Sequence, residues 1–216
     1  MKRIVAIILL VALAVCSLSS CGEKRGTGAS AYAETRDVSE RDITFVEICV
    51  KYYGKIVVLV DATTAPKTAA NFLKLVEEKF YNGLTFHRVI ENFMIQGGDP
   101  NADGTGGLDE KIEGEFLYNG FYNDIKHLRG VISMARGQSY NSASCQFFIC
   151  NADSSHLDYS YAAFGYVVEG MSIVDSITEE TAQYGDGNGK ISDKSKQAVI
   201  KYIKVLKNYT LESISE

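Results

Sequence analysis

Short runs of β-branched and other apolar residues, each bounded by turn residues, follow one another along most of the chain from residue 43 onward. Two of these runs flank Tyr53-Gly54, a pair that favours a tight turn, so this part of the chain predicts a β-hairpin. The remaining runs have the length and spacing of short strands. The strands predicted in this way cover residues 44–51, 55–61, 85–90, 130–135, 145–151, 163–168 and 198–208.

Two other segments carry their apolar residues at helical spacing. Within residues 67–80, Phe72, Val76 and Phe80 fall on one face, and Pro66 suits the first turn of such a helix. A second helix is expected to begin near Gly170 and to run to about residue 177. Many short strands interrupted by two helices predict a mainly β fold, a closed antiparallel barrel capped by the helices.

The first 21 residues have the pattern of a secretory signal peptide. Met1-Lys2-Arg3 is cationic, and the apolar run over 4–15 is shorter than the roughly 20 residues that a transmembrane helix needs. The segment ends in Leu18-Ser19-Ser20-Cys21, which resembles the bacterial lipobox, where the cysteine is acylated by fatty acids such as palmitate. We therefore expect a lipid on Cys21 and an extracytoplasmic protein anchored to a bacterial membrane. The alternative is an ordinary signal peptide whose removal leaves a soluble protein.

The rest of the chain is expected to comprise a tether, a folded domain and a short tail. Residues 22–41 are small, polar and charged without an apolar period, which predicts a flexible tether between the lipid and a folded domain. The domain is expected over residues 42–208, followed by a C-terminal tail over 209–216. The net charge of −5 is spread along the chain, and the absence of a Lys/Arg block argues against a nucleic-acid partner. A tethered domain of this kind is expected to be a monomer.

The cysteines predict free thiols rather than a disulfide framework. Three cysteines, Cys49, Cys145 and Cys150, follow the predicted lipidation site, and with an odd number at least one cannot pair within the chain. Cys145 and Cys150 lie five residues apart in one predicted strand, and hence on opposite faces of it. We expect buried thiols that pack as small apolar groups, and no nucleophilic cysteine.

Several sequence blocks recur in the order and spacing of one protein family. They are Phe86-His87-Arg88-Val89-Ile90, Phe93-Met94-Ile95-Gln96-Gly97-Gly98-Asp99, Gly104-Thr105-Gly106-Gly107, Gly130-Val131-Ile132-Ser133-Met134-Ala135, Ser144-Cys145-Gln146-Phe147-Phe148-Ile149 and Ala163-Phe164-Gly165. Through them the chain resembles the cyclophilin-type peptidyl-prolyl cis/trans isomerases from about Thr44 to Leu206. The resemblance implies a closed antiparallel eight-stranded β-barrel with two capping α-helices, and an activity that needs no cofactor.

The same blocks have a physical interpretation of their own. Gln146 and Phe148 lie two apart in a predicted strand and so face the same way. Together with Phe93, Met94 and Gln96 they predict an apolar cup rimmed by a few polar groups, which is the usual composition of a small-ligand site. Taken singly, each apolar residue is equally well explained by core packing, and Arg88 by a side chain that reaches the surface from an apolar strand.

The resemblance implies how these residues act on a proline-containing peptide. Rotation about an Xaa-Pro amide meets a barrier of ~18–20 kcal/mol and breaks no covalent bond, so complementarity to the twisted amide is sufficient. By similarity, the catalytic residues are Arg88, Phe93 and Gln96. The peptide-binding residues implied by the resemblance are Met94, Ala135, Arg136, Gln146, Phe148, His156, Leu157 and Tyr161. The expected partners are proline-containing segments of unfolded or exported proteins.

Three positions depart from the best-known pattern of the family. Arg136 stands where Asn is common, His156 where Trp is common, and Tyr161 where His is common, which predicts retained activity with an altered peptide preference. No metal site is expected, because the chain's histidines are isolated from one another. Residues 186–190 begin like a calcium loop but lack the ligands required further along, so they predict a turn. Two functions stay open: an isomerase of exported proteins, and a prolyl-peptide binding module.

Overall fold

The computed structural model describes residues 40–210 of the 216 in the chain. The predicted signal peptide, the lipidation site Cys21 and nearly all of the predicted tether lie outside the described residues, as does most of the predicted C-terminal tail. Within the described range no helix combines the length and the apolar character needed to cross a bilayer.

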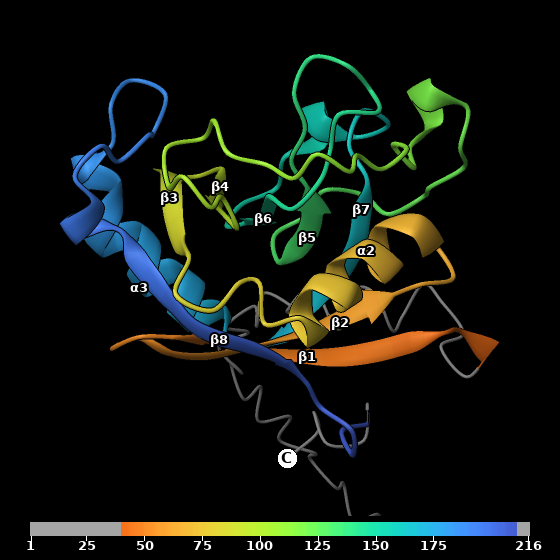
Figure 1. Ribbon diagram of the computed structural model, residues 1–216, viewed down its shortest axis with the longest axis horizontal. Helices are drawn as coiled ribbons and strands as arrows, with labels where there is room; N and C mark the ends of the chain where they lie inside the picture. Colours follow the sequence, from red (N-terminus) through yellow and green to blue (C-terminus); the bar gives the residue numbers. More distant parts are fainter. Residues whose placement is uncertain (1–39, 211–216) are drawn as a thin grey trace, which may run out of the picture.

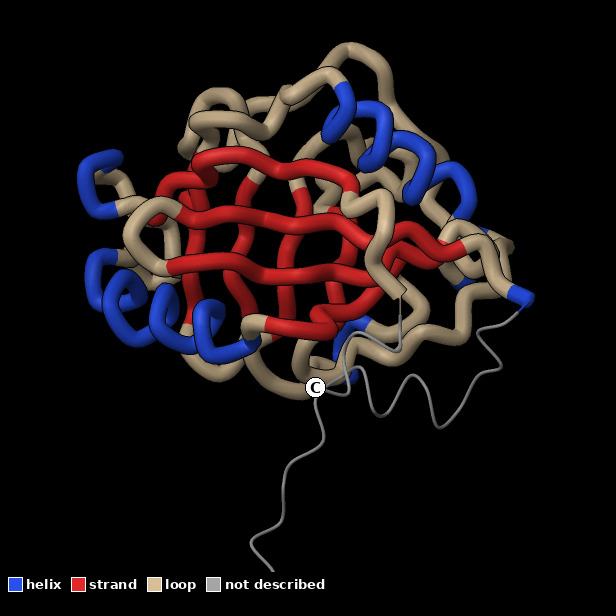
Figure 2. Tube along the Cα trace, turned by 90° about the horizontal axis from the view of Figure 1, so that it is seen from below, coloured by secondary structure: helices blue, strands red, loops and turns tan. Residues whose placement is uncertain are grey.

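Eight antiparallel strands close into one barrel, in the spatial order β1-β2-β7-β5-β6-β4-β3-β8 (Figures 1 and 2). The predicted closed eight-stranded barrel is therefore confirmed. Inward-facing side chains fill it, among them Phe86, Phe147 and Phe164, which have no exposed surface. The strands are β1 Ile43–Val50, β2 Gly54–Asp61, β3 Thr85–Ile90, β4 Met94–Gly97, β5 Val131–Met134, β6 Phe147–Cys150, β7 Ala163–Glu169 and β8 Ala198–Val205.

The two predicted helices are present and lie at opposite ends of the barrel (Figure 2). Helix α2, Pro66–Glu77, has Pro66 in its first turn, as expected, and buries Phe72 and Val76 against the barrel. Helix α3, Met171–Thr181, begins after Gly170, whose φ of 85° is in the left-handed region that glycine favours. Short 3₁₀ segments connect other elements, including η2, Leu117–Asn119, and η3, Ser155–Leu157.

Several elements differ from the sequence prediction in their existence or their bounds. Strand β4 was not predicted, because its four residues follow a turn, end in the first glycine of the pair Gly97-Gly98 and show no extended alternation. Helix α3 ends four residues later than expected, and in its last turns the hydroxyls of Thr178 and Thr181 donate to the carbonyls of Val174 and Ile177. Strand β6 begins at Phe147, so Cys145 precedes the strand in which we had placed it.

The described cysteines are free thiols, as predicted. Cys145 and Cys150 are buried and Cys49 is partly buried. Burial raises the pKa of the Cys150 thiol to about 12 and also raises the pKa of Cys145, so both stay protonated at neutral pH. These thiols therefore pack as apolar groups.

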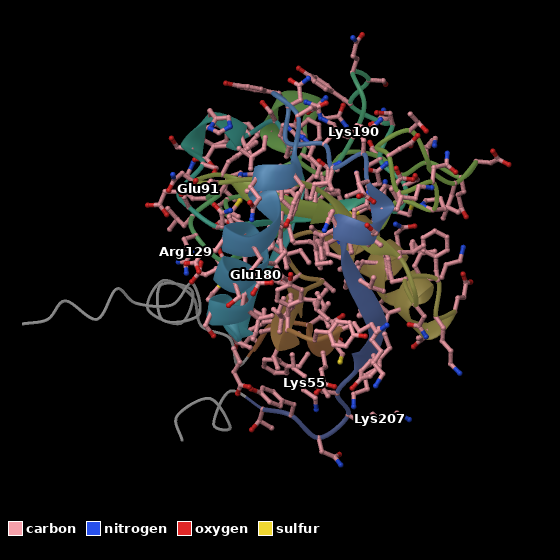
Figure 3. The ribbon with its side chains drawn as sticks, turned by 90° about the vertical axis from the view of Figure 1, so that its left-hand side faces the viewer. Lys55, Glu91, Arg129, Glu180, Lys190 and Lys207 are labelled. Carbon is pink, nitrogen blue, oxygen red and sulfur yellow. The ribbon has the colours of Figure 1, made fainter. Side chains whose placement is uncertain are left out.

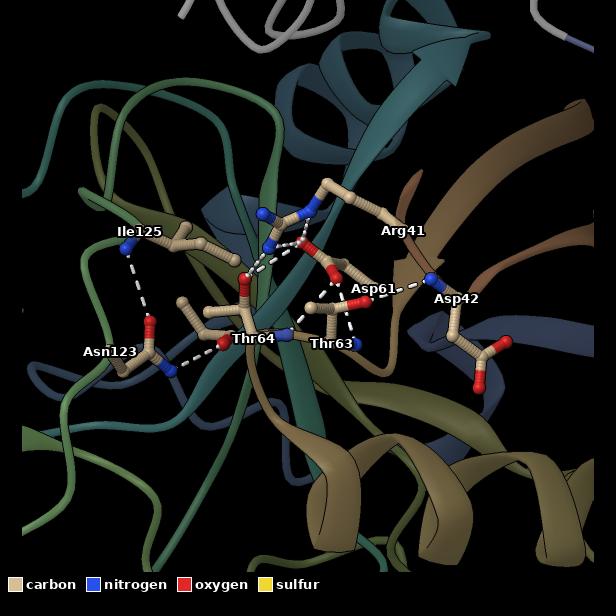
Figure 4. A network of polar contacts seen from close by, with 8 residues as sticks. Arg41, Asp42, Asp61, Thr63, Thr64, Asn123 and Ile125 are labelled. Carbon is tan, nitrogen blue, oxygen red and sulfur yellow. Dashed lines mark hydrogen bonds and ion pairs between the residues drawn. The ribbon is translucent and has the colours of Figure 1, made fainter. Parts of the chain in front are cut away.

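The start of the domain is fixed by a buried polar network (Figure 4). The Asp61 carboxylate, fully buried at the end of β2, accepts hydrogen bonds from the Arg41 guanidinium at 2.8 and 3.1 Å. It also accepts from the backbone amides of Thr63 and Thr64 at 3.0 Å and from the Thr64 hydroxyl at 2.8 Å. Arg41, which the sequence analysis assigned to the end of the tether, is thus bonded to the barrel.

Candidate active site

Strand alternation places the candidate site on the outer surface of the barrel, over β3, β4 and β6. In β4, Ile95 belongs to the interior core, whereas its neighbours Met94 and Gln96 face outward. In β6, Phe148 faces the same way as Met94 and packs with it in a separate apolar cluster. Gln96 is paired with Phe148 across the β4–β6 ladder and with Arg88 across the β3–β4 ladder. One face of three short strands therefore supplies the main side chains of the site.

These side chains form an apolar cup. Met94, Phe148 and Leu157 are nearly fully buried at its base, while Phe93 and Tyr161 are partly buried around it. The cavity has a volume of about 330 Å³. The interior of the barrel is filled by other residues, so the cup is a true hollow in the surface and not a gap in the core. Its remaining lining residues are His87, Arg88, Gln96, Asp103, Gly104, Ala135, Arg136, Asn188 and Lys190.

Arg88 is held at the cup by two hydrogen bonds. Its Nε donates to the backbone carbonyl of Asn188 at 2.8 Å, and its Nη1 donates to Oε1 of Gln96 at 3.1 Å. Nη2 has no hydrogen-bond acceptor among the described residues, so it can donate to a bound peptide. Burial lowers the pKa of Arg88 from its ordinary value, but a guanidinium remains charged at neutral pH. No described carboxylate pairs with it, and the structure thus presents a fixed, partly dehydrated cation beside an apolar cavity.

A chain of amide groups fixes the orientation of Gln96. Because Oε1 of Gln96 accepts from Arg88, its Nε2 is the donor to Oε1 of Gln146, at 2.8 Å. Nε2 of Gln146 in turn donates to the carbonyl of Gly106 at 2.7 Å. The loop that carries this carbonyl is closed around Asp99, which accepts from the amide of Asn101 at 2.7 Å. The guanidinium is therefore connected through two glutamines to a rigid backbone loop.

The turn over residues 185–191 holds the other side of Arg88. The amide of Val89 donates to the Gly189 carbonyl at 2.9 Å, which ties the turn to β3 next to Arg88. Gly189 has a φ of 78°, and a Cβ there would overlap Cγ1 of Ile90 and lie 2.7 Å from the carbonyl oxygen of Val89. Asp186 accepts from the amides of Asn188 and Lys190, so the segment is a turn stabilised from within, as predicted. Its contribution to the site was not predicted.

His127 supports the cup from beneath. Its ring lies nearly parallel to the Phe148 ring, at 18° with centroids 6.1 Å apart. Nδ1 lies 3.1 Å from a carboxylate oxygen of Asp158 and must donate to it, so Nε2 accepts from the Ser133 hydroxyl, also at 3.1 Å. Burial lowers the pKa of His127 to about 4, with the Asp158 carboxylate opposing the shift. The contact with Asp158 is therefore a hydrogen bond from a neutral ring at neutral pH.

His87 is buried beside Arg88 and also lines the cavity. Neither of its ring nitrogens has a hydrogen-bond partner in the described part of the chain. Burial lowers the pKa of His87, with the nearby Asp99 carboxylate opposing the shift. Across residues 40–210, no three His, Cys, Asp or Glu side chains gather in a way that could hold a metal ion.

The rim of the cup contains the three residues that depart from the family pattern. The Arg136 guanidinium lies 4.6 Å from the ring centre of Tyr161, and its Nε donates to the Ser160 carbonyl at 3.0 Å. Tyr161 meets the Phe148 ring edge-on at 5.9 Å. The His156 ring is exposed and packs against Phe93 at 5.0 Å, outside the cavity lining. Arg136 and Tyr161 thus bound the cup directly, whereas His156 reaches it only through Phe93.

A second hollow of about 450 Å³ adjoins the cup and shares Gln96, Gly104, Ala135 and Arg136 with it. Gln146 lines this second hollow. The two together form a continuous groove, which could hold an extended peptide in the cup and beyond it on one side.

The structure brings together nearly all of the predicted site residues. Arg88, Phe93 and Gln96 line the cup with Met94, Ala135, Arg136, Phe148, Leu157 and Tyr161, while Gln146 lines the adjoining hollow. Only Cys21, which is not described, and His156, at the rim, lie apart. Five lining residues were not predicted: His87, which lies in β3, and Asp103, Gly104, Asn188 and Lys190, which come from loops. The glycine-rich composition of both loops was the available signal, but it indicates a turn without indicating what the turn contacts.

Comparisons with known proteins find members of one family. A family model described as cyclophilin type peptidyl-prolyl cis-trans isomerase/CLD matches residues 45–205. Peptidyl-prolyl cis-trans isomerase A of Dickeya dadantii is 39% identical over 160 residues, which cover 71% of this chain and 80% of the relative. Peptidyl-prolyl cis-trans isomerase B of Escherichia coli is 41% identical over 133 residues, covering 58% of this chain and 79% of the relative.

Solved structures give the same result. The crystal structure of a Cryptosporidium parvum cyclophilin type peptidyl-prolyl cis-trans isomerase matches with a TM-score of 0.68 at 28% identity, covering 78% of this chain and 100% of that one. A crystal structure of the same isomerase in the presence of the dipeptide Ala-Pro matches with a TM-score of 0.66 at 29% identity, covering 76% and 99%.

Proposed function

The chain belongs to the cyclophilin-type peptidyl-prolyl cis-trans isomerases, and we propose that it acts on exported or cell-surface proteins while a lipid on Cys21 holds it at a membrane. As a member of this family it is an enzyme that accelerates rotation about Xaa-Pro bonds. The observation that carries the proposed mechanism is the fixed guanidinium of Arg88, with a free Nη2, beside an apolar cup.

The proposed chemistry is a change of charge distribution without any bond being broken. As the amide twists, its nitrogen loses conjugation with the carbonyl and regains a lone pair, and the barrier of ~18–20 kcal/mol reflects that loss. A cationic donor placed at this nitrogen stabilises the twisted amide more than the planar one, which lowers the barrier. Arg88 suits this role because its hydrogen bonds to Asn188 and Gln96 fix the guanidinium before the peptide binds.

The cup would hold the proline ring. A five-membered apolar ring suits a hollow with Met94, Phe148 and Leu157 at its base, and contact with them would release water from both surfaces. When the proline is held in this way, the part of the peptide before it can rotate about the Xaa-Pro amide bond. The neutral His127 ring beneath Phe148 would keep that side chain in place.

The polar rim would position the peptide backbone. Gln96 and Gln146 form the amide chain along the groove, and Arg136 bounds both hollows. An extended peptide in the groove would find donors and acceptors on one side and the aromatic Tyr161 on the other. Arg136 and Tyr161 differ from the residues that are common at these positions in the family. We expect these differences to alter the preference for residues next to the proline rather than to remove activity.

A spectroscopic proline-isomerisation assay tests the mechanism. Wild type should accelerate isomerisation of a prolyl tetrapeptide, and Arg88→Ala should lose about 10²–10³-fold of that rate, the usual effect of removing a key electrostatic donor. The apolar cup alone would also suit a second candidate function, a prolyl-peptide binding module. If wild type and Arg88→Ala bind the peptide equally, and both leave its isomerisation at the background rate, the protein is a binding module and not an isomerase.

The proposed location is supported by the sequence over 1–21, with its cationic start, short apolar run and Leu-Ser-Ser-Cys ending. Attached acyl chains would contribute about 0.8 kcal/mol of membrane binding for each buried methylene group. Mass spectrometry of the protein from bacterial membranes should find Cys21 as an acylated N-terminus, and Cys21→Ser should release the protein from the membrane fraction. An unmodified N-terminus, or an intact segment 1–21, would refute the anchor and leave the isomerase activity unaffected.

A further inference from the structure

Exposed aromatic side chains gather beside the groove. Among the described residues, eight large hydrophobic side chains are exposed, and six of these eight come from loops between residues 117 and 159. These loops lie above β5, β6 and β7 in Figure 1, on the side away from β1 and β2. Tyr118, Tyr140 and Tyr159, which are 61%, 40% and 39% exposed, are called the tyrosine shelf below.

The shelf is one connected surface. The rings of Tyr118 and Tyr159 are 6.1 Å apart, and the amide of Tyr118 donates to the carbonyl of Tyr159 at 3.0 Å. The segment that carries Tyr118 is joined to the loop that carries Tyr140, since Asn119 donates to the side-chain oxygen of Asn141 at 2.8 Å. The shelf residues are therefore held together by η2 and two loops rather than exposed independently.

The shelf is also continuous with the cup. The Tyr161 ring contacts Phe148 of the cup at 5.9 Å, and the Arg136 guanidinium lies 4.6 Å from Tyr161 and 5.0 Å from Tyr140. Taken end to end, these three distances put Tyr140 no more than roughly 15 Å from Phe148 of the cup. Four to five extended residues span that distance, at about 3.3 Å each. A chain whose proline lies in the cup can thus place nearby residues on Tyr140.

Exposed tyrosines that lie on one surface suit the binding of an apolar partner. Soluble monomers rarely leave connected apolar surface exposed, and such patches mark interaction sites. Tyrosine offers a large contact area, a hydroxyl and few rotamers to immobilise, so it binds varied apolar partners at low entropic cost. The groove next to the shelf takes an extended peptide, and its continuity with the shelf favours the same polypeptide as occupant over a folded partner.

We propose that the tyrosine shelf is a second binding surface for apolar segments of the unfolded polypeptide whose proline occupies the cup. The inference rests on the proposed isomerase mechanism and adds a substrate class, unfolded chains with apolar residues near the proline. Contact at the shelf raises the effective concentration of the proline at the cup. It therefore lowers KM for a protein substrate and leaves a tetrapeptide, which is too short to reach the shelf, unaffected.

The test compares two double variants on two substrates. Tyr118→Ser with Tyr159→Ser removes shelf aromatics that lie outside the cup and the adjoining hollow. Tyr52→Asn with Tyr184→Ser is the matched control, since both tyrosines are exposed and lie outside the shelf. Tyr52 is in the β1–β2 hairpin next to Lys55, and Figure 3 places Lys55 at the other end of the molecule from Lys190 of the cup.

The substrates are a prolyl tetrapeptide and a reduced, carboxymethylated protein whose refolding is limited by one prolyl bond. We expect the shelf variant to raise KM for the protein about fivefold or more, the usual effect of removing aromatics from an interface, with kcat unchanged. For the tetrapeptide, kcat/KM should stay within about twofold of wild type, as it should for the control variant on both substrates. Should the shelf variant not fold, Tyr118→Ser alone, on an exposed 3₁₀ segment, gives the same comparison.

An unchanged KM for the protein substrate would overturn the inference while leaving the isomerase function intact. So would an equal rise in KM with the control variant, or a shelf variant whose sole effect is to dissociate a dimer in sedimentation experiments. Wild type without activity on the tetrapeptide would instead refute the isomerase mechanism, and the inference with it.

Discussion

Acidification should destabilise the fold in part through His127, a buried histidine that lies in its neutral form beneath the cup. Burial lowers the pKa of His127 to about 4, against about 6.5 for a solvated histidine in the unfolded chain. Between these two values the unfolded state binds more protons than the folded state, so stability falls as the pH falls. The contribution is fully present above the unfolded value and is lost as the pH approaches 4.

The size of the effect follows from the two pKa values. Integrating proton uptake from pH 7 gives a loss of about 2 kcal/mol at pH 5 and about 3 kcal/mol at pH 4. That is a large fraction of the 5–15 kcal/mol by which domains are typically stable. Because His127 packs against Phe148, the same protonation should disturb the base of the cup.

Urea unfolding followed by circular dichroism at pH 7 and pH 5 measures this loss. His127→Gln keeps an amide donor for Asp158 and an acceptor for Ser133 but cannot take up a proton, so it should lose about 2 kcal/mol less than wild type over this range. His156→Gln is the matched control, because it removes an exposed histidine and should retain the wild-type loss. Equal losses in wild type and His127→Gln would refute the assignment of the pH dependence to this residue.

Three further perturbations test the supports of the site and of the fold. Gln96→Leu removes the acceptor of Arg88 Nη1 and should lower kcat about tenfold or more in the tetrapeptide assay, since a hydrogen bond to a charged group contributes about 1.5–3 kcal/mol. An unchanged kcat would show that Arg88 is positioned without this hydrogen bond. Gly189→Ala should push the turn away from β3 and lower both kcat and the melting temperature. Gly187→Ala, which has open space around its Cβ, should change neither, and equal effects of the two variants would contradict the role of Gly189. Asp61→Ala should cost about 3–5 kcal/mol in urea unfolding, because it breaks the buried ion pair between this carboxylate and the Arg41 guanidinium. A loss below about 1 kcal/mol would show that the network is dispensable.

The sequence was sufficient to predict the barrel and most of the cup. Strand β3 was predicted with its observed bounds, since its apolar residues are flanked by clear turn signals. The spacing of Gln146 and Phe148 correctly placed both on the groove side, as alternation in an extended chain depends only on local geometry. The family resemblance, rather than the spacing, identified Arg88 as part of the site, because an arginine in an apolar strand has a surface-reaching explanation as well.

Contacts between distant segments could not be predicted in this way. Asn188 is a hundred residues from Arg88, and nothing in the composition of its turn indicates that its carbonyl accepts from that guanidinium. The support that His127 gives to Phe148 depends likewise on how the loop that carries His127 packs against β6. The family pattern predicts that His156 binds peptide; the structure places its exposed ring against Phe93, outside the lining of the cavity. Such features depend on tertiary packing, which periodicity and propensity do not encode.

The central claim is that Arg88 stabilises the twisted amide more than the planar one. Arg88→Lys keeps the positive charge but replaces the planar fork by a point charge that cannot donate to Gln96, Asn188 and the peptide together. Nuclear magnetic resonance of a labelled prolyl peptide measures its affinity and the cis/trans exchange rate of the bound form in one sample. We predict that exchange in the bound peptide slows about 10²-fold while Kd changes by less than about threefold. Exchange at the wild-type rate, or a loss that falls entirely on Kd, would contradict the claim.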